Sequence, residues 1–264
     1  MTNKMKIIAA VGVVAMLFFG VVFSQEAVTK VSGELSTDVT FGDEVTFGSP
    51  YTGLSFSGEG WKLTSNLSDG NVTVEEASYE LDTGAGVTLT LGQQRVPFGT
   101  GVAWHRPSVN PFVSAPSSVT YNTGVGASVS VVGVGVEAFL GSDSLYSTRF
   151  SYSVVGHTMG VSYNNDEALL IDVTGGWSLS GVSGKSYFEY DLSEETSGNF
   201  WYRSVISHPS AIGISLLVGY SSVTTDDVAE TSMLYGVGYD FGGSSFSTEF
   251  SDDSDVVVRV SYTF

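Results

Sequence analysis

The end of the chain alternates strictly between two kinds of side chain. In residues 256–264 (VVVRVSYTF) every second position is apolar or aromatic, namely Val256, Val258, Val260, Tyr262 and Phe264. The positions between them carry Val257, Arg259, Ser261 and Thr263. A period of two places the two sets on opposite faces of a β-strand. The pattern predicts a strand whose faces meet different solvents, as in the wall of a membrane barrel or at the edge of a soluble sandwich with one wet face.

The same alternation recurs along the chain. Six further segments have apolar sets that we expect on one outward face: Tyr121, Val125, Ala127, Val129 and Val131; Val134, Val136, Ala138 and Leu140; Tyr146, Thr148, Phe150, Tyr152 and Val154; Met159, Val161 and Tyr163; Leu169, Ile171, Val173 and Trp177; Ile212, Ile214, Leu216, Val218 and Tyr220. Ser, Thr, Gly and Asn dominate the opposite face. Apolar outside and polar inside is the arrangement of a barrel wall around a wet lumen.

The connections between these strands are of two alternating kinds. The short and nearly neutral ones are 58–60, 83–86, 132–133, 155–156, 179–181, 207–211 and 241–243. The others carry Asp43, Glu44, Asp69, Asp143, Asp166, Glu167, Asp191, Glu194, Glu195, Asp226, Asp227, Glu230, Asp252, Asp253 and Asp255. Strict alternation predicts that the two kinds lie on opposite sides of a membrane.

Counting gives about 16 strands, with 14 as the alternative, because the register is ambiguous at 41–54, at 232–239 and at Arg203. A tilted spanning strand needs roughly 9 to 11 residues, and the length of the chain leaves about four or five for each connection. The predicted fold is therefore an all-β, transmembrane, antiparallel up-and-down barrel. An even strand number places both termini on one side.

The N-terminus has the composition of a signal peptide. Lys4 and Lys6 precede an apolar run at 7–23, and Ser24 is a small residue at a plausible cleavage point. We therefore expect a signal peptide at 1–24 and a barrel at 25–264. A retained inner-membrane anchor is the alternative interpretation of the same run.

Composition narrows the function classes. The formal net charge of −18 argues against nucleic acid as a partner. With no cysteine among 264 residues, disulfides and thiolate metal sites are excluded, and no cofactor is expected. The mean hydropathy of +0.17 is far below that of a helical membrane bundle, as expected when half of each strand is polar.

The final strand also resembles the closing strand of bacterial outer-membrane β-barrels. In that family a terminal Phe is the assembly signal, which here corresponds to Phe264 with Tyr262 before it. The resemblance implies a place in the cell outer membrane, contact with its lipid and with the barrel-assembly machinery. Aromatic residues near predicted strand ends fit interfacial girdles: Trp61, Tyr79, Trp177, Tyr190, Tyr220, Tyr239 and Tyr262.

One connection differs from all others. Residues 96–118 (VPFGTGVAWHRPSVNPFVSAPSS) hold four of the six prolines and follow the fifth predicted strand. Prolines without alternation exclude a membrane strand, and an ordered loop of this length is commonly functional. General diffusion porins of sixteen strands fold the loop after their fifth strand into the barrel as a constriction, and the position here resembles that plan. The resemblance also implies a homotrimer as a possible assembly.

The sequence around this loop has two weaker resemblances to known families. Residues 92–99 (GQQRVPFG) resemble a strand-end segment of phosphate-selective porins, and 99–112 (GTGVAWHRPSVNPF) resemble a segment of several outer-membrane channel families. The chain lacks the ladder of Lys or Arg that a phosphate-selective channel needs. A substrate-specific subfamily is therefore not indicated.

The loop region is locally basic. Between residues 83 and 136 there is no Asp or Glu, whereas Arg95, His105 and Arg106 fall in this window. If the loop folds inward, acids on polar strand faces would lie opposite: Glu34, Asp38, Glu75, Glu80, Asp172, Glu189 and Glu249. These residues are our candidates for constriction and selectivity. The arginines either create a transverse electric field across the lumen or anchor the loop to wall carboxylates. The sequence is compatible with both roles.

Other charges have simpler interpretations. Lys62, Arg149, Lys185 and Arg259 are expected inside the barrel as salt-bridge partners across neighbouring strands. The acidic runs at 226–227 and 252–255 could attract cations or hold Ca²⁺ or Mg²⁺, but neither has an EF-hand spacing, so we interpret them as solvated loops and expect no metal site.

An enzyme is not expected. The three histidines, His105, His157 and His208, fall at different levels of the predicted barrel, and no Gly-x-Ser-x-Gly or His-Glu-x-x-His motif is present. The sequence therefore predicts an outer-membrane porin for passive diffusion of small hydrophilic solutes and ions. A plugged or structural barrel acting as an anchor or adhesin is the alternative, and a barrel hydrolase comes after it.

Overall fold

The computed structural model describes residues 30–48, 50–68, 71–101, 106, 109–110, 112, 120–193, 198–208, 212–225, 228–251 and 255–264. The predicted signal peptide at 1–24 lies outside these residues. The elements are β1 (Lys30–Phe41), β2 (Val45–Phe47), β3 (Tyr51–Gly58), β4 (Trp61–Ser68), β5 (Asn71–Asp82), β6 (Val87–Arg95), β7 (Tyr121–Val131), β8 (Val134–Gly141), a 3-10 turn (Ser142–Ser144), β9 (Tyr146–Val154), β10 (His157–Asn164), β11 (Leu169–Leu179), β12 (Val182–Asp191), β13 (Phe200–Ser207), β14 (Ile214–Thr225), β15 (Val228–Asp240), β16 (Ser244–Ser251) and β17 (Val256–Thr263). In this part of the chain no helix is long and apolar enough to cross a membrane.

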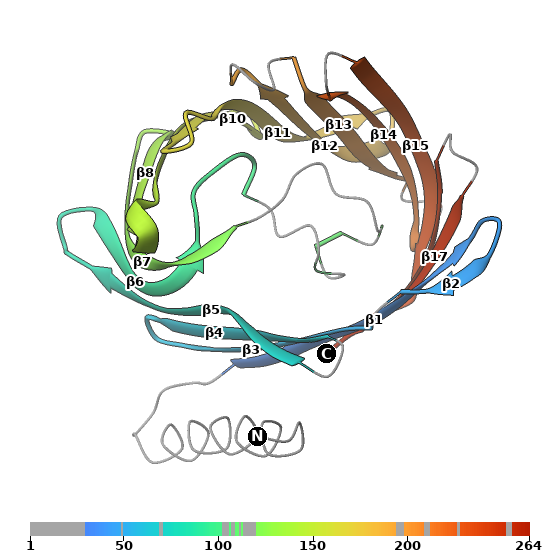
Figure 1. Ribbon diagram of the computed structural model, residues 1–264, viewed down its shortest axis with the longest axis horizontal. Helices are drawn as coiled ribbons and strands as arrows, with labels where there is room; N and C mark the ends of the chain where they lie inside the picture. Colours follow the sequence, from blue (N-terminus) through green and yellow to red (C-terminus); the bar gives the residue numbers. More distant parts are fainter. Residues whose placement is uncertain are drawn as a thin grey trace.

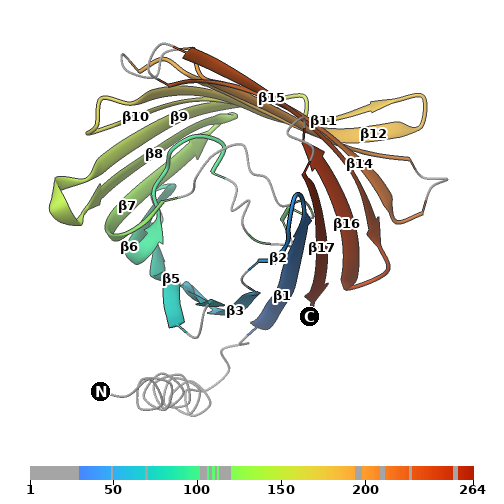
Figure 2. The ribbon, with the colours of Figure 1, turned by 45° about the vertical axis from the view of Figure 1, so that its right-hand side comes forward.

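The strands form a closed ring (Figure 1). Each strand pairs antiparallel with the next, and β17 returns to β1 with Asp38 opposite Arg259 and Glu34 opposite Thr263. Sixteen strands make the ring, and the short β2 lies outside it, paired with the end of β1. The predicted sixteen-strand barrel is confirmed, and the ambiguous segment at 41–54 contains the extra strand (Figure 2).

The exposure of apolar and polar side chains on the two faces of the wall is the reverse of that in a soluble protein. Outward apolar side chains are exposed, such as Leu140 at 64% and Phe150 at 57%, whereas inward Asp172 and Glu189 are fully buried. A soluble fold would bury the first kind and expose the second. The soluble sandwich is therefore wrong, and the exterior is suited to hydrocarbon.

The connections alternate between two ends of the barrel, as the sequence predicted. The turn end carries 59–60, 83–86, 132–133, 155–156, 180–181, 208, 212–213 and 241–243. The loop end carries the described acids Asp43, Glu44, Asp143, Asp166, Glu167 and Asp255. At Val132-Gly133 and Val155-Gly156 both central residues have positive φ, between 48° and 80°. This is the two-residue hairpin geometry whose twist matches that of paired strands.

Two wall assignments were wrong. Tyr121 was expected on the outward face, but its hydroxyl accepts a hydrogen bond from Arg106 of the loop at 3.3 Å. Ile212 was expected in a strand, but it lies in the turn before β14 and is 84% exposed. Both residues lie at strand ends, where alternation no longer fixes the direction of a side chain.

The last residue completes the seam between the two ends of the sheet. The backbone of Phe264 exchanges two hydrogen bonds with Gly33 of β1, at 2.9 and 3.0 Å. The Phe264 ring covers Gly33, where a Cβ would overlap it, and stacks with Tyr262 at 5.8 Å between centroids. An aromatic ring over a strand glycine replaces packing that the glycine lacks. The role of Tyr262 and Phe264 as an assembly signal stays a prediction.

Candidate functional site

The first described residues of the β6–β7 loop contact the lumen face of strands that follow β7 and β8 around the ring. The Gly99 amide donates to Ser162 Oγ of β10 at 3.1 Å, and the Thr100 amide donates to Glu189 Oε1 of β12 at 2.8 Å. Gly99 has φ of 63°, and a Cβ there would lie 2.8 Å from Glu189 Oε1. Only glycine fits this left-handed position against the wall.

A further contact strengthens this first anchor. Ser147 Oγ of β9 donates to the carbonyl oxygen of Pro97 at 2.8 Å. Ser147 and Ser162 have no exposed surface, although both are small polar residues on the lumen side of the wall. The start of the loop therefore covers the inner surface of β9 and β10.

The second anchor is on the opposite wall. Arg106 Nη2 donates to Glu75 Oε2 of β5 at 3.0 Å and to the Tyr121 hydroxyl at 3.3 Å. The Arg106 and Glu75 side chains are 12% and 9% exposed. Burial lowers the pKa of the Arg106 guanidinium, but Tyr121, Glu75 and Tyr51 outweigh it, so this pKa is raised from its ordinary value. Arg106 stays charged and paired.

A β-bulge in β5 makes this anchor available. Thr64 lies opposite Glu76 and Ser65 lies opposite Val74, so Glu75 is the extra residue of the longer strand. Neighbouring residues normally face opposite sides of a sheet, but here both side chains lie on the lumen face. Glu75 binds the loop residue Arg106, and Glu76 binds Lys62 of β4 at 2.6 Å. Bulges commonly re-aim a side chain in this way.

The third anchor joins the loop to the barrel seam. Arg259 of β17 binds both carboxylate oxygens of Asp38 on β1, at 2.8 and 3.2 Å. Its Nη1 donates to the loop carbonyls of Asn110 at 3.2 Å and Phe112 at 2.6 Å. One guanidinium thus holds β1, β17 and the loop together.

Phe112 is seated in the wall beside this arginine. Its ring is fully buried, and a Cβ at Gly236 of β15 would lie 3.0 Å from Phe112 Cε1. The described loop residues therefore contact β9, β10 and β12, then β5 and β7, then β15 and β17. The described loop residues thus contact widely separated strands of the ring.

Two predicted acids pair with wall arginines. Asp172 binds Arg149 through two hydrogen bonds, at 3.1 and 2.6 Å, across β10. Gly160 lies between them, and a Cβ there would be 2.5 Å from Arg149 Nη2. Glu249 lies 3.6 Å from Arg203, with both side chains 3% exposed. Arg149 also lies 3.6 Å from Glu137, its register partner on the neighbouring strand β8, so the expected pairing across neighbouring strands is confirmed. Gly160 additionally opens a path from Arg149 to Asp172 on β11.

Arg95 has the weakest pairing of the predicted residues. Its Nη2 lies 3.9 Å from Glu137 Oε1 of β8, and Glu137 also lies 3.6 Å from Arg149. Arg95 packs directly under Gly101 of the loop, where a Cβ would overlap the guanidinium. Glu137, at 34% side-chain exposure, was not among the predicted residues, since no local pattern distinguishes it from other inward acids.

The remaining predicted residues are placed differently. Glu34 lies opposite Thr263 on β1 and is close enough to Tyr51 to act on it electrostatically, as Glu75 and Arg106 of the second anchor do. Glu80 is exposed opposite Thr90 near the turn end. His105 lies outside the described residues. His157 and His208 are both at the turn end. Among the described residues no group of acids and histidines could hold a metal ion, and the acidic runs 226–227 and 252–254 lie outside them.

The site also contains residues that the sequence did not single out: Ser147, Ser162, Asn110, Phe112, Arg203 and Tyr51. Buried serines look like any lumen serine in the sequence. The cluster of small residues Gly160, Gly219, Gly236 and Gly238 on inward positions was the available signal, because such gaps admit long side chains from other strands.

With this geometry in hand, comparison with solved structures identifies the architecture. A mutant of Rh. blastica porin superposes with a TM-score of 0.64 at 12% identity, covering 89% of this chain and 100% of the porin. The chain has the porin fold. OmpT, an outer membrane protein of Vibrio cholerae in its trimer form, gives a TM-score of 0.59 at 13% identity, covering 91% and 100% of the two chains. No family model and no curated protein sequence matches. The predicted resemblance to porins is thus confirmed in the fold.

Proposed function

We propose that this protein is an outer-membrane porin for passive diffusion of small hydrophilic solutes and ions. The observation that carries the proposal is a polar-lined ring of sixteen strands in which described residues of one loop are anchored to the lumen face at three places. A ring of this size is too wide for side chains to fill, so it encloses water unless a separate element plugs it. The loop at 96–118 narrows that space and sets the size limit.

The exterior of the barrel supports the location. Exposed Val, Leu, Phe and Tyr side chains surround the wall, and the Rh. blastica porin and OmpT neighbours are outer-membrane barrels by fold or name. We place the short turns in the periplasm and the acidic loops outside the cell. The partners are then membrane lipid and the barrel-assembly machinery, and the trimer form of OmpT motivates a homotrimer.

The ion pairs favour the anchoring role of arginine over the field-shaping role. Arg106 binds Glu75 at 3.0 Å, and Arg95 lies 3.9 Å from Glu137, so both loop-region arginines face a wall carboxylate, Arg106 the more closely. Paired charges contribute little to a transverse field. The excess of acids at the loop end then gives a weak preference for cations.

Catalysis is not part of the proposal. A hydrolase needs a nucleophile, a base and an orienting acid within mutual reach. His157 bonds its own turn carbonyl at Val155, 3.1 Å away, and His208 lies in another turn. Neither described histidine reaches the loop.

The test is single-channel conductance of the refolded mature protein in planar bilayers, with the reversal potential in a KCl gradient. Discrete open steps with a cation-selective reversal potential are expected. A folded, heat-modifiable barrel without conductance would overturn the channel. The three loop anchors would then favour a plugged, structural barrel.

A further inference from the structure

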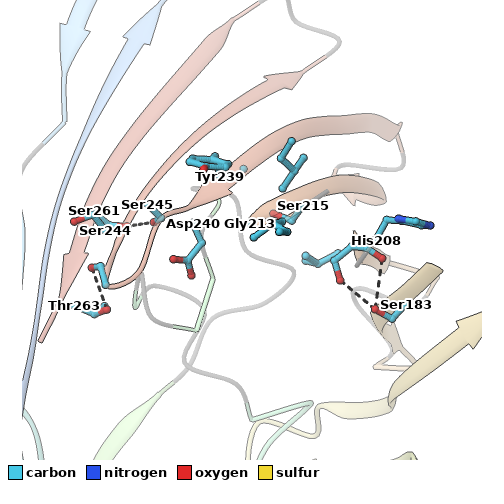
Figure 3. Close-up of a pocket in the computed structure, with 16 residues that line it drawn as sticks. Ser183, His208, Gly213, Ser215, Tyr239, Asp240, Ser244, Ser245, Ser261 and Thr263 are labelled. Carbon is cyan, nitrogen blue, oxygen red and sulfur yellow. Dashed lines mark hydrogen bonds between the residues drawn. The ribbon is translucent and has the colours of Figure 1, made fainter. Parts of the chain in front are cut away.

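A cavity opens on the inner wall at the turn end, on the arc between β12 and β17 (Figure 3). Its volume is about 670 Å³, within the usual range of small-molecule sites, roughly 300–1,000 Å³. Its polar lining includes Ser183, Ser207, Ser215, Asp240, Ser245 and Ser261 on the strands, together with His208, Tyr239, Ser244 and Thr263. Six adjacent strands, β12 to β17, thus contribute hydroxyl groups or a carboxylate to one surface.

A missing side chain gives the cavity its depth. Gly238 of β15 lies opposite Ser215, and a Cβ there would be 2.8 Å from Ser215 Oγ. The same Cβ would lie 3.5 Å from Phe112 Cζ, the loop ring seated in this wall. The cavity therefore lies beside the loop anchor, on its turn-end side. A solute that has passed the loop meets this surface next.

The hydroxyl groups are arranged in cross-strand pairs. Ser183 Oγ lies 3.2 Å from Ser207 Oγ, and Ser245 Oγ lies 2.5 Å from Ser261 Oγ. Each hydroxyl has one donor and two acceptor positions, so a pair that shares one hydrogen keeps further capacity for a solute. The pairs fix the oxygens in place before any solute arrives, which lowers the entropy lost on binding.

The charge of the surface selects the solute. Among the described lining residues Asp240 is the only acid and His208 is the only basic residue. Asp240 Oδ1 accepts from the Gly242 amide at 2.8 Å, which holds the carboxylate at the rim (Figure 3). A carboxylate repels anions and accepts hydrogen bonds from hydroxyl donors. Many neutral hydroxyls and one carboxylate match a neutral solute that is rich in hydroxyl groups.

We propose that this hydroxyl-lined cavity transiently binds neutral polyhydroxylated solutes, namely sugars of one or two rings. The inference names a substrate class for the diffusion channel and in that sense rests on the proposed function. Binding is weak, as a transport site requires, because strong binding would slow release.

The first test measures binding without conduction. Saturation-transfer NMR with sucrose is carried out on the folded protein in detergent. The variant S207A/S215A/S245A is expected to bind sucrose about tenfold more weakly, because each lost neutral hydrogen bond contributes a factor of a few. The control S153A/T158V removes a hydroxyl pair of 2.8 Å at the same end, on β9 and β10 outside the cavity, and is expected to bind as the parent does. Equal binding by the parent and the triple variant, or none by the parent, overturns the inference.

A second variant guards against a folding defect in the triple variant. Asp240→Asn keeps an oxygen for the Gly242 amide but removes the charge, and we expect it to weaken sucrose binding severalfold. Unchanged binding in a folded Asp240→Asn protein contradicts the part assigned to the carboxylate.

Conductance then separates the two proposals. Sucrose added at the turn end is expected to produce current noise beyond that of a polyethylene glycol of equal size, and the noise is expected to fall in the triple variant. Open channels without sucrose-specific noise or NMR binding leave the porin proposal standing and overturn the sugar site. Serine-dependent NMR binding to a barrel that never conducts leaves the site standing and overturns the channel.

Discussion

The continuous wall and the closing seam of this barrel use the same chemical pair for different purposes. In the wall, Arg149 of β9 binds Asp172 of β11 through two hydrogen bonds of 3.1 and 2.6 Å. At the seam, Arg259 of β17 binds Asp38 of β1 through two hydrogen bonds of 2.8 and 3.2 Å. All of these groups face the lumen, and both arginines are less than 10% exposed.

The difference between the pairs lies in what else each arginine holds. Arg149 and Asp172 are 23 residues apart in sequence, in strands joined through β10. Arg259 and Asp38 are 221 residues apart and join the two ends of the sheet, and Arg259 also binds two loop carbonyls. The comparison teaches that topology, and not the pair itself, decides whether an arginine supports the wall alone or also the closure and the loop.

The largest effect is expected for Arg259→Ala. This variant loses four hydrogen bonds, leaves Asp38 without its cation, and releases the loop near Phe112. We expect a loss of about 4 kcal/mol in the free energy of unfolding, because one partner of a buried pair is removed. Urea unfolding in lipid vesicles, followed by tryptophan fluorescence, measures the loss. Single-channel conductance should rise at the same time, and unchanged conductance would show that Arg259 does not hold the loop.

Arg149→Ala is the matched change in the wall. It should cost about 3 kcal/mol, since Asp172 is fully buried and loses its bidentate partner. Arg149 has no hydrogen bond with a described loop residue, so conductance should change much less than in Arg259→Ala. A conductance rise as large as that of the seam variant would contradict the division of roles.

Gly160→Ala tests whether the wall pair needs a missing side chain. The new methyl group would overlap Asp172 and lie 2.5 Å from Arg149 Nη2, and such overpacking costs about 2 kcal/mol. Gly176→Ala on β11 is the control, because its Cβ would meet nothing closer than 3.8 Å. Equal urea midpoints for the two variants would show that Arg149 and Asp172 have room to move apart.

Arg106→Ala has a smaller effect on stability than Arg149→Ala, about 2 kcal/mol, because one hydrogen bond to a charged group is lost, but it should change selectivity. Removing the guanidinium leaves the Glu75 carboxylate uncompensated near the loop. We expect the cation-to-anion permeability ratio from reversal potentials to rise by about twofold. Glu75→Gln should move the ratio the other way, and a shift of the same sign in both variants would refute charge pairing as the cause.

Lys62→Ala should have the smallest effect. Its ion pair with Glu76 is short, 2.6 Å, but the lysine side chain is 43% exposed to the lumen. A solvated pair of this kind is worth about 0.5 kcal/mol and is screened by salt. Urea unfolding at low and high salt measures it, and a loss above that of Arg106→Ala would mean that the lumen screens charge poorly.

Much of the fold could be predicted from the chain because each strand is a local pattern. Alternation at 256–264 and in the other strands fixed which face each residue takes, and the Val-Gly turns fixed the register of their hairpins. The prediction failed for Tyr121 and Ile212 at strand ends, and the sequence did not predict β2. Short segments next to loops carry too few alternating positions.

The candidate site was predictable only in part. Local basicity pointed to Arg106, and alternation put Glu75 among the inward acids, but nothing local showed that the two meet. The bulge that turns Glu75 inward beside Glu76 depends on the pairing of β4 with β5. The contacts of Glu137 and Phe112 could not be predicted for the same reason, because only the closed ring brings their partners close to them.

The sequence by itself determined the barrel class, the polar lumen and the position of the unusual loop, and it narrowed the strand number to 16 or 14, since period and turn chemistry act between near neighbours. Only the tertiary structure decided which arginine closes the seam, where the loop is anchored, and which serines line one cavity. Those contacts join residues up to 221 positions apart. They arise only when sixteen strands close, because closure brings the two ends of the sheet and the loop to the same place.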